Sequence, residues 1–348
     1  MAIRPGGRLK WGVFELCGIN ILGTGAYLPE IRVDNNMLAD LVDTSDEWIT
    51  TRTGMKQRHM VNGETTWYMG AMASKRAIED AGIDASEIGL IVDATITSDF
   101  YTPSAACVIQ REIGAFNAAA FDLNAACTGF VYSLDTAKRF LQTDPNLKYV
   151  LVVANEMLSG ITDFTDRSSC ILFGDGAGAV IIERSEKLYG SWLGANGNLA
   201  HALYAKLALN SHPFKSGEPV SIKNSETEFT ESPAKLVQHG KDVYKFATNA
   251  LPTASLNACK SAGIDISEID VFIPHQANIR IIETASKNLN IPIEKFILNL
   301  QNVGNTSGAS IPLAFDKFVK NGHIKRGQKC CLVGFGAGST LGAIVLEY

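Results

Sequence analysis

The sequence has no run of lysine or arginine and no long apolar segment. Its 31 basic residues are scattered along 348 positions, and the formal net charge is −5. A nucleic-acid-binding protein usually carries a concentrated basic surface, so this class is excluded. The longest apolar runs, such as residues 149–154, fall far short of the roughly 20 residues that a membrane-spanning helix requires. We therefore expect neither nucleic acid nor a membrane among the partners.

Cysteine pairs that would hold a metal or form a redox motif are also missing. There are seven cysteines, with no CxxC pair and no histidine–cysteine cluster at metal-ligand spacing: Cys17, Cys107, Cys127, Cys170, Cys259, Cys330 and Cys331. This pattern predicts reduced thiols, a cytoplasmic location and no metal site. Arg4, Arg8 and Lys10 precede an apolar stretch, but Glu15 and several glycines interrupt it, which disfavours a signal peptide.

The chain does contain enough apolar residues for a large core, in one domain or in two of half the size. Hydrophobic residues make up 46% and charged residues 19%, as in a globular enzyme. The segment AGIDASEIGLIV (81–92) recurs 181 residues later as AGIDISEIDVFI (262–273), with seven of twelve positions identical. In both copies a helix, at 66–81 or 253–262, stops at a glycine before a short acidic turn and an apolar strand. A duplicated α/β unit is predicted; a chance match between two glycine-capped turns is the alternative.

Strands and helices alternate along both halves. We predict strands near residues 17–22, 88–96, 119–123, 149–154 and 178–184, and again near 188–195, 269–274, 329–334 and 342–347. Because these strands are continuously apolar, helices must cover both faces of each sheet, which gives a five-layered αβαβα fold of the α/β class. We place an N-terminal arm at 1–16, the first half at 17–185 and the second half at 186–348. Residues 201–235, with three prolines, are expected to form a surface excursion.

One cysteine stands in a context that favours chemistry. Cys127 follows a predicted buried strand at 119–123 and a turn at 124–126, and it precedes a predicted helix at 129–142. The unpaired amides and dipole of a helix N-terminus favour negative charge, so we expect a lowered thiol pKa and a nucleophilic thiolate. A small buried core residue is the alternative interpretation. Cys107, the rival candidate, falls inside an amphipathic helix that starts near Pro103, and core packing explains it better.

A histidine and an asparagine are candidate partners of that thiol. His275 directly follows the strand of the second repeat copy, and reactive groups of parallel α/β sheets gather outside the carboxyl ends of strands. Capping of the next helix is its alternative role. Asn305 lies in a run of small residues, GNTSGAS (304–310), that leads into a predicted helix at 311–320. Ordinary turn chemistry would also explain an asparagine there.

Eight ordered motifs between residues 18 and 348 surround these positions: GTGAYLP (23–29), TSDEWI (44–49), RTG (52–54), PSAAC (103–107), AACTGF (125–130), FGDGAGA (173–179), PHQAN (274–278) and GNTS (304–307). Together they resemble the β-ketoacyl-acyl carrier protein synthase III family of the thiolase superfamily. The resemblance implies a duplicated thiolase-like fold, a homodimer and a catalytic set of Cys127, His275 and Asn305. A histidine in place of Asn305 would indicate the elongating synthases, so the asparagine indicates the initiating branch.

The resemblance also implies a reaction. A Cys127 thiolate would attack an acyl-CoA thioester, with the oxyanion held by the backbone amides of Cys127 and Ala337. Malonyl-acyl carrier protein would then decarboxylate, and His275 and Asn305 would stabilise the enolate before its carbon attacks the acyl group. This condensation starts fatty acid synthesis. Coenzyme A enters as part of a substrate, so no separate cofactor is expected.

Further residues are assigned by the same resemblance. Those expected to bind coenzyme A are Trp48 and Arg167 around the adenine, Arg52 near the phosphates, and Asn278. Those expected to face the acidic carrier protein are Lys245, Arg280 and Lys287. A core tryptophan and solvated basic side chains are the alternatives.

Some positions depart from the family pattern. Thr102 stands where short-chain members often carry a bulky aromatic residue, so a deeper acyl pocket, open to medium or long chains, is our hypothesis. Around Ala337, Ser339 and Leu341 the usual extra glycine and aromatic residues are missing, which leaves the shape of the acyl and malonyl pockets open.

Three other functions compete with initiation of fatty acid synthesis. A specialised condensing or acyl-transfer enzyme of secondary metabolism would keep the fold and the thiolate. A non-catalytic carrier-protein scaffold would not need Cys127, His275 and Asn305. A papain-like protease uses the same three residue types, but its flanking sequence differs and the repeat has no place in it.

Overall fold

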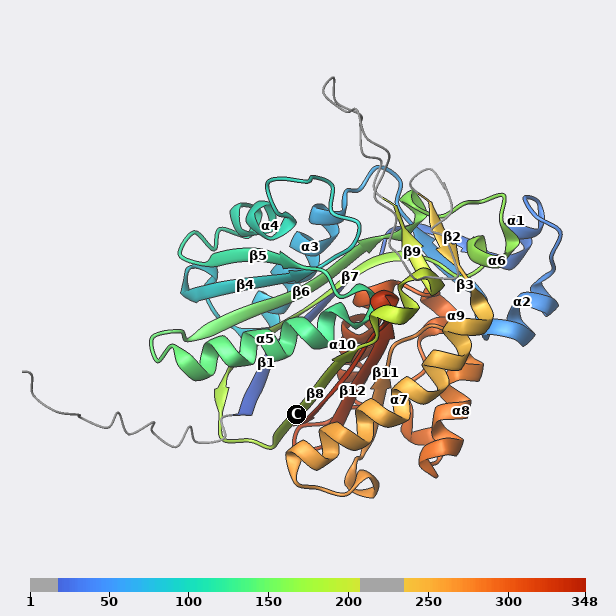
Figure 1. Ribbon diagram of the computed structural model, residues 1–348. Coiled ribbons are helices and arrows are strands. Elements are labelled where there is room, and N and C mark those ends of the chain that lie inside the picture. The colour runs from blue at the N-terminus through green and yellow to red at the C-terminus, as the bar shows by residue number, and fades with distance from the viewer. Residues whose placement is uncertain (1–17, 207–234) are drawn as a thin grey trace, which may run out of the picture.

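Two sheets lie face to face, with helices between and outside them (Figure 1). The computed structural model describes residues 18–206 and 235–348 of the chain. The first sheet has five strands in the order β1 (Gly18–Tyr27), β7 (Asp175–Ser185), β6 (Tyr149–Met157), β4 (Ile88–Ala94) and β5 (Ala119–Leu123). The second has four, in the order β8 (Tyr189–Ala195), β13 (Thr340–Glu347), β12 (Lys329–Gly336) and β11 (Val271–Pro274).

The second sheet repeats the strand directions of the first. In the first sheet β4 runs parallel to β5 and β6, while β7 is antiparallel to both β6 and β1. In the second sheet β11 runs parallel to β12, while β13 is antiparallel to both β12 and β8. At the place that corresponds to β5, a single parallel bridge joins Phe272 to Phe296. The topology confirms the predicted α/β fold built from two duplicated halves.

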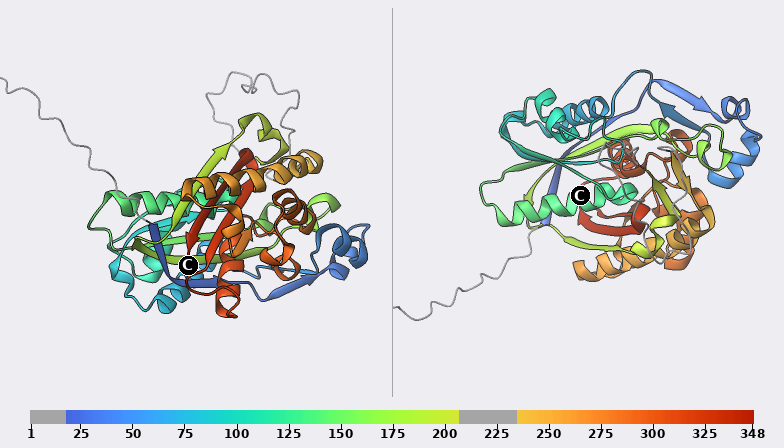
Figure 2. Two further views of the ribbon diagram at one scale, coloured as in Figure 1. Left: turned by 90° about the horizontal axis from the view of Figure 1, so that it is seen from below. Right: turned by 45° about the horizontal axis from the view of Figure 1, so that its top comes forward.

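The helices complete five layers (Figure 2). The middle layer contains α5 (Gly129–Thr143) and α10 (Ser310–Lys320), which pack against both sheets. The outer layer over the first sheet contains α3 (Thr66–Ala81) and α4 (Ala105–Ile113), and that over the second contains α7 (Gly240–Ala262) and α8 (Ile279–Leu289). Buried apolar residues fill each of the spaces between layers, because every sheet face meets an amphipathic helix.

The two copies of the repeated segment fold in the same way. The glycine that ends each helix has φ of 65° in the first copy and 71° in the second, a conformation that glycine adopts without a steric cost. Each glycine leads into a 3₁₀ turn with a reciprocal capping box, between Asp84 and Glu87 in the first copy and between Asp265 and Glu268 in the second. The sequence repeat is therefore a repeat of local hydrogen bonding.

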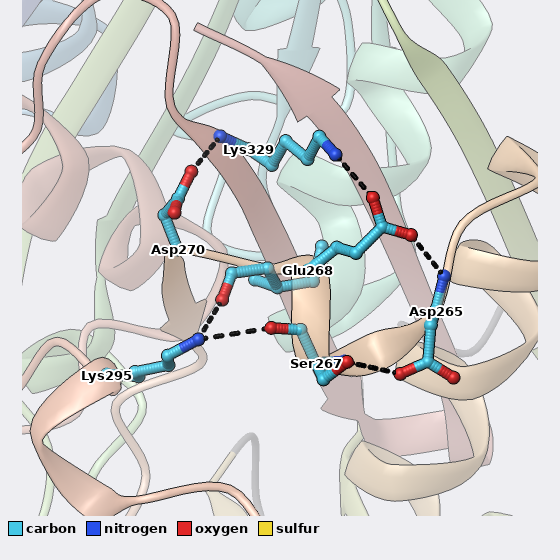
Figure 3. A network of polar contacts seen from close by, with 7 residues as sticks. Asp265, Ser267, Glu268, Asp270, Lys295 and Lys329 are labelled. Carbon is cyan, nitrogen blue, oxygen red and sulfur yellow. Dashed lines mark hydrogen bonds and ion pairs between the residues drawn. The ribbon is translucent and has the colours of Figure 1, made fainter.

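An ion pair is repeated at the same spacing. The Lys148 ammonium lies 2.7 Å from the Glu87 carboxylate, and 181 residues further on Lys329 lies 2.6 Å from Glu268. Figure 3 shows the second copy, in which the Lys295 ammonium also reaches the backbone of the turn. Lys148 directly precedes β6 and Lys329 begins β12, so each ion pair ties its turn to the sheet.

Helix α7 begins at Gly240, well before the predicted start at 253. The prediction stopped at Pro252 because proline lacks the N–H that a helix interior needs. In the structure Pro252 lies inside the helix, and the carbonyl of Thr248, its missing partner, accepts a hydrogen bond from Asn288 Nδ2 of α8 at 3.3 Å. A tertiary contact thus replaces the lost helical bond.

Several short elements, not expected from the sequence, complete the fold: β2 (Ile31–Asp34), β3 (Gln57–Met60), β9 (Leu203–Ala205), β10 (Leu236–Gln238), α1 (Asn35–Ala39), α2 (Asp46–Thr53), α6 (Arg167–Cys170), α9 (Leu300–Val303), and the 3₁₀ turns η2 (Ala126–Thr128) and η7 (Ser307–Ala309). Strands β9 and β10 pair at the two ends of the predicted excursion over 201–235, whose central part lies outside the described residues. The predicted arm at 1–16 also lies outside them. None of the helices in the described ranges is long and apolar enough to span a bilayer.

Candidate active site

Cys127 lies in a sharp turn between β5 and α5. It is the middle residue of η2, and the residue before it, Ala126, has φ of 47°, which residues with a Cβ rarely adopt. Helix α5 starts two residues later at Gly129, so the thiol stands at the helix N-terminus, and it is 7% exposed.

Burial raises the pKa of the Cys127 thiol to about 12, and the nearby Glu156 carboxyl adds to this rise while the Ser307 hydroxyl opposes it. The expectation of a lowered pKa, based on the helix N-terminus alone, is therefore wrong for the free enzyme. The helix position is local and visible in sequence, but the burial that outweighs it includes tertiary contacts with distant residues, such as the approach of Gly336 to Cys127 N. The resting residue is a thiol, and some group must take its proton before it can act as a nucleophile.

His275 follows directly after β11. Its backbone N–H donates to Val333 O at 2.8 Å, which extends the pairing of β11 with β12. The imidazole is 1% exposed, and its Nδ1 lies 2.7 Å from Ser310 Oγ at the start of α10. Burial lowers the pKa of His275 to about 3, so the ring is neutral at pH 7. Because Ser310 occupies Nδ1, Nε2 is the nitrogen left to meet a ligand.

Asn305 is held by backbone hydrogen bonds on both sides. Its N–H donates to Leu172 O at 2.9 Å, and its carbonyl accepts from the Gly174 N–H at 3.0 Å. The side-chain oxygen accepts from the Ser307 N–H at 2.9 Å. Since Oδ1 is engaged in this way, the amide Nδ2 is the side-chain group left to donate to a ligand.

Cys127 and Asn305 stand in equivalent turns of the two halves. Ala126 in η2 and Ser307 in η7 are 181 residues apart, the spacing of the repeat, and have φ of 47° and 49°. In both turns the side-chain oxygen of an asparagine two residues earlier accepts a hydrogen bond from the backbone N–H of this residue. The asparagine is Asn124 in the first half and Asn305 in the second. The duplicated fold therefore presents the same turn twice, each time with an asparagine at its start, and only the turn of the first half carries a thiol.

Cys127, His275 and Asn305 border one cavity of about 130 Å³. Most of its other walls are apolar, and they include Leu158, Leu172, Leu203, Val243, Ile281 and Phe335. A larger groove of about 1000 Å³ lies along β1 and α10, and none of the three residues borders it. Within 18–206 and 235–348, no cluster of three or more histidine, cysteine, aspartate or glutamate side chains is arranged to hold a metal ion.

The end of β12 lies against the turn that carries Cys127. A Cβ built on Gly336 would be 2.6 Å from Cys127 N, much closer than side chains pack, so a glycine is needed at this approach. The next residue, Ala337, borders the cavity. Cys127 and Ala337, whose backbone amides were predicted to hold an oxyanion, thus border the same space.

The residues predicted to bind coenzyme A form one cluster. The guanidinium carbons of Arg167 and Arg52 lie 5.0 and 5.8 Å from the ring centroid of Trp48, which is 38% exposed. Asn278 Nδ2 donates to Arg52 O at 3.1 Å, and Asn278 also borders the cavity of Cys127. Asn278, rather than His275, caps α8, by accepting the Arg280 N–H at 2.9 Å.

Other predicted positions lie apart from the cavity. Thr102 is exposed in the loop before α4 and does not border the cavity, so within one chain it forms no wall of an acyl pocket. Cys107 lies in α4 as expected, but it is exposed and not packed in a core. Lys245 on α7 and Arg280 and Lys287 on α8 are all exposed, on helices that pack against each other beside the cavity.

Three polar residues around the cavity were not expected from the sequence. Ser307 and Ser310 are buried in the small-residue run that holds Asn305, and Glu156 is fully buried at the end of β6. Burial raises the pKa of Glu156 to about 7. A signal for Glu156 was present, since an acidic residue ends the apolar strand VLVVANEM (150–157).

Comparisons with known proteins agree with this geometry. Residues 121–197 match the family described as 3-oxoacyl-[acyl-carrier-protein (ACP)] synthase III, and residues 259–348 match its C-terminal part. The beta-ketoacyl-[acyl-carrier-protein] synthase III of Clostridium acetobutylicum is 46% identical over 332 residues, which cover 95% of this chain and 98% of that protein. The crystal structure of 3-oxoacyl-[acyl-carrier-protein] synthase III from Aquifex aeolicus VF5 is 39% identical with a TM-score of 0.86, over 95% of this chain and 100% of that one. The priming beta-ketosynthase of the R1128 polyketide pathway is 34% identical with a TM-score of 0.84, over 94% and 96%.

A duplicated α/β fold of this topology, with Cys127, His275 and Asn305 of the two halves at one cavity, defines a condensing enzyme of the thiolase type. The 46% identity with the Clostridium acetobutylicum protein extends over nearly the full length of both chains. The chain belongs to the β-ketoacyl-acyl carrier protein synthase III family of acyltransferases.

Proposed function

We propose that the enzyme condenses an acyl-CoA with malonyl-acyl carrier protein and so starts fatty acid synthesis, with Cys127 as the nucleophile. The observation that carries the proposal is the single cavity bordered by Cys127 of the first half and by His275 and Asn305 of the second. In the first step the Cys127 sulfur bonds to the thioester carbonyl carbon and the coenzyme A sulfur leaves. The backbone amides of Cys127 and Ala337 would hold the oxyanion of this step.

In the second step His275 and Asn305 act on the malonyl thioester. Ser310 Oγ lies 3.4 Å from the Gln276 N–H, which donates to it, so we assign the hydroxyl proton of Ser310 to His275 Nδ1. This leaves a proton on Nε2, and Nε2–H and Asn305 Nδ2 both donate to the enolate oxygen as carbon dioxide leaves. The enolate carbon then bonds to the acyl carbon and releases the Cys127 sulfur. A neutral imidazole suits this role, since it stabilises the enolate without needing a proton from solvent.

The cluster around Trp48 would bind the nucleotide of coenzyme A. Its exposed indole face and the Arg167 guanidinium suit an adenine ring, and Arg52 supplies positive charge for the phosphates. Asn278 connects this cluster to the cavity, so the pantetheine arm would run past it toward Cys127.

The size of the cavity supports a short acyl substrate. About 130 Å³ is well below the roughly 300–1,000 Å³ of pockets that enclose a drug-sized ligand. Since Thr102 does not border the cavity, the hypothesis of a deeper pocket gains no support from the single chain.

Lys245, Arg280 and Lys287 would receive the carrier protein. All three are exposed on α7 and α8, the two helices that supply Tyr244 and Ile281 to the cavity wall. Positive side chains at this place suit an acidic partner whose thioester arm must enter the cavity.

We also propose a homodimer that forms along β5. This strand is an unpaired edge of the first sheet, and unpaired edges favour pairing with another strand. Large exposed side chains gather in the segments around it: Phe100, Tyr101, Phe116 and Phe140. Sedimentation of Phe116→Glu should show a shift from dimer to monomer, while an unchanged dimer would contradict this interface.

The six cysteines within the described residues are free thiols, which supports the proposed cytoplasmic location.

Intact-protein mass spectrometry after exposure to acyl-CoAs of increasing length tests the proposal. A short acyl group should add to the protein, and Cys127→Ala should abolish the adduct. Cys107→Ala is the matched control, since Cys107 is the exposed thiol that would react by unspecific exchange, and its adduct should equal that of the unchanged enzyme.

A specialised role in secondary metabolism is the alternative, favoured by the similarity to a polyketide priming enzyme. Condensation with a dedicated carrier protein but not with the fatty acid carrier would establish it.

A further inference from the structure

Glu156 is a buried carboxyl that the proposed reaction does not use. Its Oε2 accepts three hydrogen bonds: from Thr97 Oγ1 at 2.7 Å, from the Ile96 N–H at 3.1 Å and from Thr95 Oγ1 at 3.4 Å. The donors come from the segment after β4, so one side of the carboxyl is fixed. The other oxygen, Oε1, is buried without a hydrogen bond of normal geometry.

Oε1 faces the η7 turn. A Cβ built on Gly308 would lie 3.6 Å from it, so the carboxyl is close to the backbone of this turn. Burial raises the pKa of Glu156 to about 7, and this rise is opposed by hydrogen bonding from Thr97, Ile96, Ser307 and Gly308. The Ser307 hydroxyl is thus near enough to favour the ionised carboxylate.

The same hydroxyl is next to the Cys127 thiol. Hydrogen bonding from Ser307 opposes the rise that burial causes in the pKa of Cys127. Like Glu156 Oε1, Ser307 Oγ is buried and makes no hydrogen bond of normal geometry. The η7 turn packs against both η2, which carries Cys127, and β6, which carries Glu156, so Ser307 is close to both groups; contacts of this kind commonly tighten only when substrate is bound.

His275 is a poor acceptor for the thiol proton. Burial leaves the pKa of Cys127 at about 12 and that of His275 at about 3, so transfer from sulfur to imidazole is strongly uphill. Glu156, with its pKa near neutrality, is a far better base in the same part of the molecule.

We propose that Ser307 and Glu156 form the path by which the Cys127 thiol loses its proton during acylation. As the bond between sulfur and the acyl carbon forms, the thiol proton passes to Ser307 Oγ, and the proton of Ser307 passes to Glu156 Oε1. When the coenzyme A sulfur leaves as a thiolate, the same path returns one proton to it and Glu156 is ionised again. Ser307 contacts the reacting sulfur, and Glu156 acts through Ser307. The inference rests on the proposed role of Cys127.

Few titratable groups face this path. The Glu156 charge interacts with Cys127 in η2 and with Asp93 on β4, and His275 at the end of β11 borders the same cavity. The segment after β4 and the η7 turn contribute neutral hydroxyls and amides. A pH profile of thiol reactivity should therefore report mainly on Glu156.

The test compares the pH dependence of Cys127 alkylation by iodoacetamide with that of its acylation by acetyl-CoA. In the unchanged enzyme both rates should rise with pH through an apparent pKa near 7. Glu156→Gln keeps the shape of the side chain and an oxygen that accepts from Thr97, but it cannot take a proton. Ser307→Ala removes the hydroxyl that would pass the proton from Cys127 to Glu156. In both variants the rise should move to alkaline pH, and acylation at pH 7 should fall about 100-fold. Glu156→Asp should recover part of the neutral profile.

Asp175→Asn is the matched control, since Asp175 is an equally buried carboxyl whose hydrogen-bond partners are Val61 and Ser159, and it should leave both profiles unchanged. A neutral profile and normal rate in folded Glu156→Gln or folded Ser307→Ala would overturn the proton path; if one of the two fails to fold, the other decides. If acetyl-CoA does not acylate Cys127 in the unchanged enzyme, the proposed function fails. The iodoacetamide profile, which needs only the thiol, still tests the path.

Discussion

A single methyl group at Gly336 should disable the backbone site for the oxyanion. Gly336 has φ of −161°, an extended conformation that alanine adopts freely, so Gly336→Ala introduces no backbone strain of its own. The new Cβ would lie 2.6 Å from Cys127 N, about 0.8 Å inside the 3.4 Å at which ordinary contact begins. It would also lie 3.1 Å from Ala126 Cβ, so the whole turn must move away from β12.

Such a movement is large compared with what catalysis tolerates. Oxyanion donors act at roughly 2.7–3.1 Å, and loss of one donor costs about 10²–10³ in rate. We expect acylation of Cys127 to slow about 100-fold, and overpacking to lower the free energy of unfolding by about 1–3 kcal/mol.

Rapid-quench mass spectrometry of the Cys127 adduct measures the first effect, and chemical denaturation measures the second. Gly197→Ala is the matched control, because a Cβ at Gly197 has nothing within 4 Å, and it should change neither quantity. Acylation by folded Gly336→Ala within about twofold of the unchanged rate would refute the reasoning, since a donor lost from the oxyanion site should cost far more.

Three further changes have defined outcomes. Ser310→Ala leaves His275 Nδ1 buried without its partner, so carbon dioxide release from a malonyl thioester by the acylated enzyme should fall about 10-fold while acylation is spared; equal losses in both steps would contradict this. His275 has a pKa of about 3 when folded and about 6.5 when unfolded, so the unfolded chain binds more protons between these values and stability falls as pH drops below about 6.5. His275→Asn should therefore lose less Tm between pH 7 and 5, and parallel curves would argue against a neutral buried ring. Trp48→Ala should raise KM for acyl-CoA about 10-fold without affecting a thioester that lacks the nucleotide; an equal effect on both would remove Trp48 from the nucleotide site.

The sequence predicts the layers of this fold because their signals are local. Each long strand is an apolar run, and helices α3 and α5 start and end within one residue of the predicted positions. The start of α7 could not be predicted, since the group that compensates for Pro252 is Asn288, a residue on another helix.

The candidate site likewise has features that neighbouring residues predict and features that depend on distant contacts. Cys127, His275 and Asn305 stand beside turns and strand ends that can be read from neighbouring residues, and their catalytic roles stay predictions. The thiol pKa and the position of Glu156 could not be predicted, because they depend on contacts that join residue 156 to residues 97 and 307.

The repeated turn also shows where the two halves had to become different. Gly308 is the counterpart of Cys127, and Ala94 is the counterpart of His275, at the repeat spacing of 181. A side chain at Gly308 would begin 3.4 Å from Ala126 O, so a second thiol there would occupy the space between the turns. At these two positions, two halves identical to the first would give two thiols and no histidine, and two halves identical to the second would give two histidines and no thiol. In the proposed reaction one thioester is attacked and another supplies the carbon nucleophile, so the two substrates need different groups. The two halves supply them because they differ at these few positions of the repeat.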